Sequence, residues 1–269
     1  MTILVTGATG NIGRLLVDQL LARGATNVRA LTNNPARAAL PSGVEVVEGY
    51  LRRLDTLPAA FAGVERMYLA PTPETATEVL ALARQAGIRH VVDLSGEPES
   101  WWGGVTAAVE ASGLAWTHLW PGDFMENVRI WARQIREIGA VHEPYPDRAS
   151  APIAMADIAA VAAVALLGTG HEGESYSLAG PEVLTRAELV RQLGVAIGRE
   201  IPFVQVSRER TIEVLTPTMG DTATWYVDSV LGGMTENPQE PVHSVAELTG
   251  KPATSFAEWA ATHAEKVIA

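Results

Sequence analysis

Apolar residues follow two different spacings through the first half of the chain. Short runs rich in Val, Ile and Leu alternate with longer segments in which apolar residues recur every three or four positions. The short runs are typical of strands and the longer segments of helices, so their alternation predicts βαβ units and a parallel sheet. The predicted strands are residues 3–6, 28–32, 44–49, 66–70, 90–95 and 115–120.

The first predicted helix follows the first strand after a short loop that contains glycines. Ile12, Leu16 and Leu20 recur at helical spacing, and Gly24 stands where a helix commonly ends. We therefore expect this helix to extend from about Asn11 to Arg23.

The pattern changes after residue 120. Residues 142–152 are rich in proline and polar side chains, which predicts a connection leaving the sheet. Helices are predicted for residues 157–167 and from about residue 185, with a short strand at 174–180 between them. We expect an α/β fold: a doubly wound parallel sheet in residues 1–141, and a small, mainly helical C-terminal lobe in residues 142–269. This lobe is expected to be interleaved with the end of the sheet and not to fold independently.

Charge and composition restrict the classes of partner. The chain has 31 acidic and 20 basic residues, for a formal charge of −11, which disfavours binding to nucleic acid or to an acidic membrane surface. It contains no cysteine, so disulfides and thiolate metal sites are excluded, and no pair of histidines has the spacing of metal ligands. We expect a cytoplasmic monomer or homodimer that acts on a small molecule without a metal.

The loop in ILVTGATGNIGRLL has the glycine spacing of a dinucleotide-binding turn. Gly7 would allow the tight turn, Gly10 the close approach of a pyrophosphate, and Gly13 the packing of helix on sheet. Thr9, Asn11 and Ile12 lie in the same loop and helix start. The alternative is a strand-to-helix turn that holds no ligand.

The end of the second predicted strand bears on the choice of cofactor. An acidic residue there would accept hydrogen bonds from the ribose hydroxyls of NAD, but the chain has Thr32, Asn33 and Asn34. Arg37 follows and can reach a 2′-phosphate, which favours NADP over NAD. The alternative is that Arg37 is only a solvated surface residue.

Several longer motifs lie outside the glycine loop or extend it. They read GATGNIGR, NNPARA, SGLAWTHLWPGDFMEN, MADIAAVAAVAL, YSLAGPEVLTRAELV and IGREIPFVQV. With these motifs the chain resembles the NmrA-like family of atypical short-chain dehydrogenases/reductases over residues 1–206. The resemblance implies an NAD(P)-binding Rossmann domain with a small C-terminal substrate lobe. Members include NADPH-dependent quinone reductases, redox-sensing regulators that do not turn the dinucleotide over, and tailoring proteins of aromatic polyketide pathways.

The chain departs from the family pattern at three positions. Asn33 stands where the family commonly has an arginine for the 2′-phosphate, Tyr50 where it has an aspartate near adenine, and Trp120 where it has an arginine. Tyr50 can still stack on an adenine. The residues expected to bind the cofactor are Gly7, Thr9, Gly10, Asn11, Ile12, Gly13, Asn33, Arg37, Tyr50 and Ala70.

The catalytic pair of typical short-chain dehydrogenases is absent. That pair is a tyrosine with a lysine four residues later, and the two lysines here, Lys251 and Lys266, do not follow any tyrosine at that spacing. Hydride transfer to an electron-poor acceptor depends more on alignment than on a strong acid. His118 and Ser95 are the candidate acid/base and hydrogen-bonding groups. The alternatives are a core histidine and a capping serine.

Aromatic residues concentrate around the fifth and sixth predicted strands, where a flat ligand can stack. The candidate substrate-binding residues are Trp101, Trp102, Trp120, Phe124 and Asn127. The alternative is that the aromatic residues belong to the core, and for Trp116 this is favoured.

The leading hypothesis is an NADP-dependent oxidoreductase that reduces a quinone or a polycyclic aromatic carbonyl or enone, in aromatic polyketide metabolism. One alternative is a non-redox tailoring enzyme for cyclisation, coupling or dehydration on the same fold. The other is a dinucleotide-binding redox sensor without turnover.

Overall fold

The computed structural model describes residues 1–233 and 241–268. The chain divides into two compact units, each built from three segments. The first unit consists of residues 1–121, 155–178 and 244–251, and the second of residues 122–154, 179–243 and 252–269. The first unit therefore takes in segments from both sides of residue 141, where the sequence predicts a boundary.

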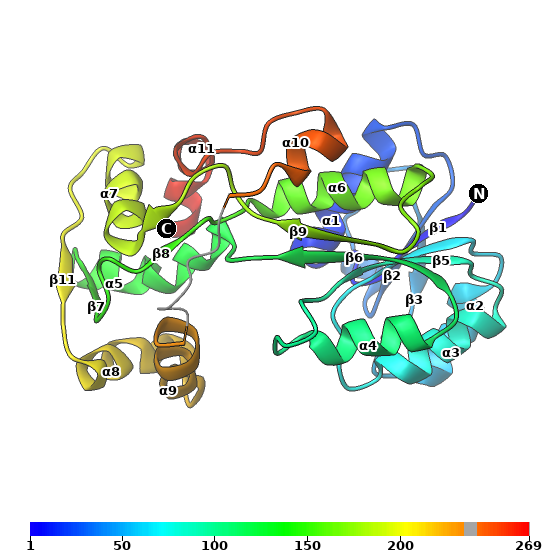
Figure 1. Ribbon diagram of the computed structural model, residues 1–269, viewed down its shortest axis with the longest axis horizontal. Helices are drawn as coiled ribbons and strands as arrows, with labels where there is room; N and C mark the ends of the chain where they lie inside the picture. Colours follow the sequence, from blue (N-terminus) through cyan, green and yellow to red (C-terminus); the bar gives the residue numbers. More distant parts are fainter. Residues whose placement is uncertain (234–240, 269) are drawn as a thin grey trace. The chain divides into compact units, whose positions relative to one another are not determined.

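The first unit contains a seven-stranded parallel sheet, which confirms the predicted fold class (Figure 1). The central strands are covered on both faces, so the runs that form them are almost continuously apolar, whereas the edge strands at the two ends of the sheet contain exposed residues. The strand order is β3 (Glu45–Glu48), β2 (Val28–Thr32), β1 (Ile3–Val5), β4 (Arg66–Leu69), β5 (His90–Leu94), β6 (Ala115–Pro121) and β9 (Glu174–Leu178).

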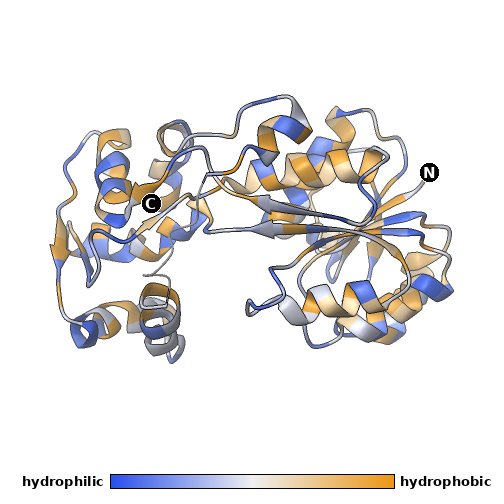
Figure 2. Ribbon diagram, viewed as in Figure 1, coloured by the Kyte–Doolittle hydropathy of each residue, from blue (hydrophilic) through white to orange (hydrophobic). Residues whose placement is uncertain are grey.

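Helices cover both faces of this sheet. On one face lie α1 (Asn11–Ala22) and α6 (Met155–Leu167), which pack against each other, with α10 (Ser244–Thr249) against α6. The other face carries α2 (Leu57–Phe61), α3 (Ala76–Gln85) and α4 (Gly103–Ala111) (Figure 1). Helix α6 is apolar around most of its circumference (Figure 2), because it packs against the sheet and two other helices.

The predicted helices around the sheet are largely confirmed. The first begins at Asn11 as expected and ends at Ala22, and the helix expected from residue 157 begins two residues earlier, at Met155. Two connections between strands contain short 3-10 turns, η1 (Pro35–Arg37) and η2 (Leu54–Thr56).

The second unit is mainly helical. Its core contains Trp131, Ile135, Leu193, Phe256 and Trp259. The sequence predicts a helix near Thr185, and the Thr185 hydroxyl caps one by accepting a hydrogen bond from the Glu188 amide. The helical elements are η3 (Met125–Trp131), α5 (Ala132–Glu137), α7 (Arg186–Ala196), α8 (Arg208–Met219), α9 (Thr222–Trp225), η4 (Tyr226–Leu231) and α11 (Phe256–Ile268). The strands are β7 (Val141–Glu143) paired with β11 (Phe203–Gln205), and β8 (Ala149–Ser150) paired with β10 (Leu184–Thr185).

Candidate functional site

The loop between β1 and α1 needs glycine at two positions, Gly7 and Gly13. Gly7 has φ +58°, and a Cβ there would lie 3.1 Å from the Ala70 Cβ. A Cβ on Gly13 would lie 2.2 Å from the Gly7 carbonyl oxygen, so any side chain at Gly13 would displace the loop. The Gly10 amide donates to the Gly7 carbonyl oxygen at 2.9 Å, which closes the turn.

The start of α1 is suited to an anion. Gly10 occupies the N-cap position and offers no side chain to the amides of the first turn, and the first turn carries no acidic residue. The first hydrogen bond along the helix is donated by the Arg14 amide to the Gly10 carbonyl oxygen at 3.0 Å. The amides before Arg14 therefore point out of the helix end, where a pyrophosphate would accept their hydrogen bonds.

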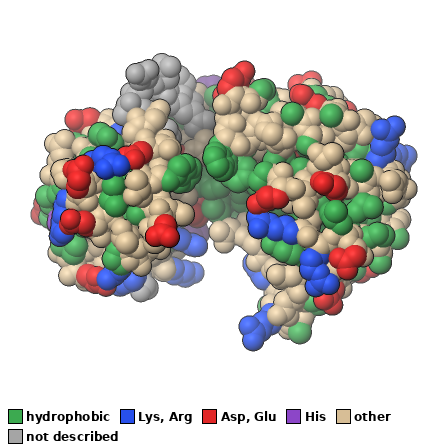
Figure 3. Space-filling model, turned by 90° about the horizontal axis from the view of Figure 1, so that it is seen from below, with side chains coloured by type: hydrophobic (Ala, Val, Ile, Leu, Met, Phe, Trp, Pro, Cys, Tyr) green, Lys and Arg blue, Asp and Glu red, His purple; other side chains and the backbone are tan. Residues whose placement is uncertain are grey.

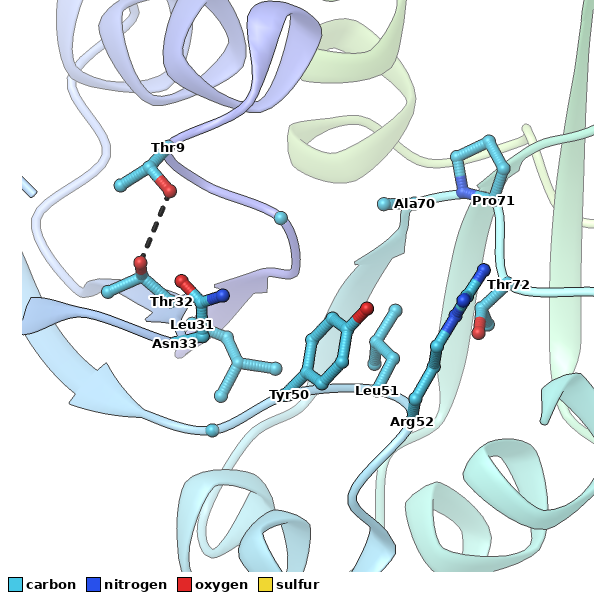
Figure 4. Close-up of a pocket in the computed structure, with 12 residues that line it drawn as sticks. Thr9, Leu31, Thr32, Asn33, Tyr50, Leu51, Arg52, Ala70, Pro71 and Thr72 are labelled. Carbon is cyan, nitrogen blue, oxygen red and sulfur yellow. Dashed lines mark hydrogen bonds between the residues drawn. The ribbon is translucent and has the colours of Figure 1, made fainter. Parts of the chain in front are cut away.

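A cavity of about 290 Å³ lies beside this loop, at the carboxyl edge of the sheet. In parallel sheets this edge is where ligands bind. Figure 4 shows the side chains that surround it, which come from the glycine loop and from the ends of β2, β3 and β4. The lining residues are Gly7, Thr9, Leu31, Thr32, Asn33, Gly49, Tyr50, Leu51, Arg52, Ala70, Pro71 and Thr72.

The end of the cavity at β2 is polar but not acidic. The Thr9 and Thr32 hydroxyls lie 3.2 Å apart, and the Asn34 amide donates to the Thr32 hydroxyl. None of the twelve lining residues is acidic. This composition fits a ribose that carries a 2′-phosphate better than a ribose whose hydroxyls donate to a carboxylate.

Arg37, expected at the 2′-phosphate, lies just outside this set. It is exposed on η1, the turn that follows Asn34. The guanidinium of Arg14 donates to the carbonyl oxygens of Ala38 and Ala39, at 2.6 and 2.8 Å, and so ties that turn to α1.

The segment after β3 supplies the wall opposite the glycine loop. Tyr50 is 42% exposed, and its amide donates to the Thr56 hydroxyl at 3.1 Å. Arg52 forms an ion pair with Glu74 at 2.7 Å. In Figure 4 both side chains rise from this segment toward the cavity. The sequence analysis identified Tyr50 but missed Arg52 and Thr72, because nothing in a loop composition shows which side chains face a cavity.

Among the expected cofactor residues, five line the cavity: Gly7, Thr9, Asn33, Tyr50 and Ala70. Gly10, Asn11, Ile12 and Gly13 form the start of α1, with Ile12 and Gly13 buried against the sheet.

His118 lies inside the first unit. Its side chain has no exposed surface, and its Nδ1 lies 2.6 Å from Oδ2 of Asp93, which is equally buried. Its ring stacks on Trp116 with ring centroids 4.1 Å apart. These contacts favour the interpretation of His118 as a core residue. They disfavour a role in which His118 itself contacts the substrate. The sequence analysis did not single out Asp93, since an aspartate in an apolar strand is detected only through its partner.

Ser95 lies at the carboxyl edge of the sheet and is 5% exposed. Its amide donates to the Leu119 carbonyl oxygen, which continues the pairing of β5 with β6. The Thr106 hydroxyl on α4 lies 3.1 Å from the Ser95 hydroxyl and donates to the Gly96 carbonyl oxygen at 2.7 Å.

Three of the expected substrate residues belong to the first unit. Trp101 is 76% exposed and Trp102 is also exposed, both in the segment before α4. Trp120 is half-buried near the end of β6, and its indole N–H is buried with no hydrogen-bond partner among the described residues. A flat ligand could stack on the exposed indole of Trp101. An acceptor atom on such a ligand could accept a hydrogen bond from the Trp120 indole.

Phe124 and Asn127 belong to the second unit, where they line a small cavity with Arg186 and Tyr226. Asn127 donates to Asp123 at 2.7 Å. Beneath them, Arg186 forms a buried ion pair with Glu143, which also accepts a hydrogen bond from the Trp131 indole at 2.6 Å.

The rest of the described surface has few special features. Acidic and basic side chains are interspersed over the face shown in Figure 3. Within residues 1–233 and 241–268, no cluster of histidine and acidic residues has the arrangement of a metal site. No helix in those ranges is both long and apolar enough to span a membrane.

Comparison with known proteins agrees with this geometry. Residues 7–97 match the profile of an NAD(P)H-binding family. The chain is 37% identical to the (4-alkanoyl-5-oxo-2,5-dihydrofuran-3-yl)methyl phosphate reductase of Streptomyces griseus, over 98% of each protein. It is 33% identical to an NAD(P)H azoreductase of Xenophilus azovorans, over 97% of this chain and 98% of that protein.

A solved structure shows the same fold with cofactor. The NADPH-dependent quinone oxidoreductase of Escherichia coli in complex with NADPH superimposes with a TM-score of 0.85 at 26% identity, over 96% of this chain and 98% of that one. The expected NADP cofactor and oxidoreductase class are thereby confirmed. The chain belongs to the NmrA-like family of atypical short-chain dehydrogenases/reductases and is an NADPH-dependent oxidoreductase.

Proposed function

We propose that this oxidoreductase reduces an electron-poor conjugated acceptor, a quinone or a polycyclic aromatic carbonyl or enone, by direct hydride transfer. The observation that carries the proposal is the cavity beside the glycine loop, in a chain that has no tyrosine followed by a lysine four residues later. An acceptor activated by its own conjugation does not need that pair, because the developing charge is spread over the acceptor. The names of the relatives support this class, since a quinone, an azo compound and an unsaturated oxo-furan are all conjugated acceptors.

The cofactor would lie along the carboxyl edge of the first unit. The start of α1 would hold its pyrophosphate, Arg37 would pair with the 2′-phosphate, and Tyr50 would stack on adenine. When bound, NADPH supplies the hydride.

The acceptor would bind near the end of β5 and β6. Ser95 would donate a hydrogen bond to its carbonyl oxygen, and Trp120 offers an unpaired indole donor beside it. Trp101 and Trp102 provide aromatic surface before α4. The sequence predicts acceptor binding for Phe124 from the aromatic cluster and for Asn127 from the family motif, and the family resemblance suggests a place in aromatic polyketide metabolism. Both stay predictions.

Calorimetric titration with NADPH and NADH, followed by quinone turnover, tests the proposal. We expect NADPH to bind more tightly than NADH and to be consumed when a quinone is added. Binding without consumption by any conjugated acceptor would indicate a redox sensor instead. No binding of either dinucleotide would leave cyclisation, coupling or dehydration as the chemistry to test.

A further inference from the structure

A buried polar pair lies on the face of the sheet that α4 covers. Asp93 on β5 and His118 on β6 are register partners, joined at 2.6 Å, and neither side chain has exposed surface. Asp93 Oδ1 and His118 Nε2 have no hydrogen-bond partner among the described residues. Leaving a buried polar atom unpaired costs about 1–3 kcal/mol. Packing alone therefore does not account for this pair.

One end of the pair approaches the carboxyl edge of the sheet. Ser95 directly follows β5 and continues its pairing with β6, and it lies two residues after Asp93, so strand alternation places both side chains on the same face. The Thr106 hydroxyl donates its single proton to the Gly96 carbonyl oxygen at 2.7 Å and lies 3.1 Å from the Ser95 hydroxyl, so Thr106 does not fix the direction of the Ser95 proton. Burial raises the pKa of the Asp93 carboxyl, and the hydrogen bond with His118 and the proximity of the Ser95 hydroxyl oppose part of that rise.

The other end of the pair approaches solvent. His118 Nε2 lies 3.7 Å from Oε1 of Glu110 on α4, and the Glu110 side chain is 52% exposed. This distance exceeds a hydrogen bond, but an exposed carboxylate can close it by rotating about its own side-chain bonds. Glu110 therefore connects the buried imidazole to bulk water.

The remaining neighbours keep water away from the pair. Trp116 and Trp120 stack on the two sides of His118, with ring centroids at 4.1 and 5.8 Å. Tyr68 on β4 is fully buried, and the pKa of its phenol is raised by burial and by the nearby Asp93. It is a neutral neighbour that does not compete for the proton.

We propose that Glu110, His118, Asp93 and Ser95 form a proton relay from solvent to the acceptor oxygen. This inference rests on the proposed function, because reducing a carbonyl requires one hydride and one proton. Ser95 gives its hydroxyl proton to the acceptor oxygen and takes one from the Asp93–His118 pair. The pair regains its proton at His118 Nε2 from Glu110, which is reprotonated by water. One proton thus leaves solvent for each hydride transferred.

Two acceptors with different proton requirements test the relay. A quinone takes up hydride and a proton, whereas a cationic triarylmethane dye takes up hydride alone and becomes neutral. The readout is the ratio of the quinone rate to the dye rate with NADPH. We expect Glu110→Gln and Asp93→Asn to lower this ratio, Asp93→Asn by about tenfold or more. A purely structural pair would reduce both rates equally.

His90→Gln is the matched control. His90 is also a buried histidine on this pair of strands, hydrogen-bonded to Thr117 at 2.8 Å, but it lies at the opposite end of β5. It should leave the ratio unchanged. A ratio that Glu110→Gln and Asp93→Asn leave unchanged would overturn the relay. A wild-type protein that reduces neither acceptor would instead refute the proposed function.

A second readout needs neither cofactor nor turnover. In protein labelled with ¹⁵N-histidine, the imidazole signals of His118 are assigned by their loss in His118→Gln. We expect Glu110→Gln to slow the exchange of the His118 N–H proton with solvent, because Glu110 is the group that carries it. Exchange at the same rate in both proteins would overturn the relay whatever the turnover assay shows. Glu110 is exposed, so this variant keeps the fold.

Discussion

A Cβ placed on Gly13 would lie 2.2 Å from the carbonyl oxygen of Gly7. The contact is with backbone, so no side chain can move aside to accommodate it. Gly13→Ala should therefore displace the loop and abolish NADPH binding in calorimetry.

Gly104→Ala is the control for this substitution. Gly104 lies in α4 with no atom within 4 Å of a Cβ, so alanine there should raise the free energy of unfolding by about 0.5–1 kcal/mol and leave NADPH affinity unchanged. Equal NADPH affinity in Gly13→Ala and wild type would show that the cofactor binds elsewhere.

Arg37 sets the preference for NADPH over NADH if it pairs with the 2′-phosphate. Arg37→Gln should weaken NADPH binding by about tenfold, as expected for the loss of a charge-assisted contact, while NADH affinity stays the same. Arg53→Gln is the comparison, because Arg53 is exposed and does not line the cavity. A parallel loss of affinity for both dinucleotides would refute the assignment.

His90 should make the protein less stable in acid. Burial, with smaller contributions from neighbouring charges, lowers the pKa of His90 to about 4. Since its pKa in the unfolded chain is about 6.5, the unfolded state binds the proton first as pH falls. The stabilisation is fully present above pH 6.5 and is lost between pH 6.5 and 4. Melting temperatures across this window should fall less steeply in His90→Gln. Identical slopes would contradict the prediction.

Breaking the buried ion pair of the second unit should be costly. Glu143 has no exposed side-chain surface and accepts hydrogen bonds from both Arg186 and the Trp131 indole. Glu143→Gln leaves the Arg186 charge uncompensated, and urea unfolding should show a loss of about 3–5 kcal/mol.

The exposed pair between Arg208 and Asp228 provides the contrast. It is also bidentate, with both distances 2.6 Å, but both side chains are more than 40% exposed. Asp228→Asn should cost at most about 1 kcal/mol. A similar loss for both variants would mean that burial does not determine the difference.

The glycine loop and the strands could be predicted because their signals are local. The apolar run from Ile3 to Val5 and the glycine spacing after it need no distant partner to be recognised. His118 shows the limit of this reasoning. Strand alternation places its side chain on the same face as those of Trp116 and Trp120, but it does not say that α4 covers that face. Asp93 becomes visible only once β5 and β6 are paired.

The cavity wall shows the same limit. Arg52 and Thr72 belong to loops whose composition is ordinary, and they face the cavity because β3 and β4 end at the same edge of the sheet. Tyr50 was identified only because it replaces the aspartate of a family motif. The composition of its own loop would not have singled it out.

The three-segment construction of the first unit has a consequence for how the chain is made. Helix α6 and strand β9 are synthesised only after residues 122–154 of the second unit. Until then β6 is an open edge strand, and the apolar surfaces of α1 and the sheet that α6 covers stay in contact with water. A nascent or truncated chain ending near residue 141 would therefore present an edge and an apolar face that favour aggregation, and the protein is best produced with all three segments in one polypeptide.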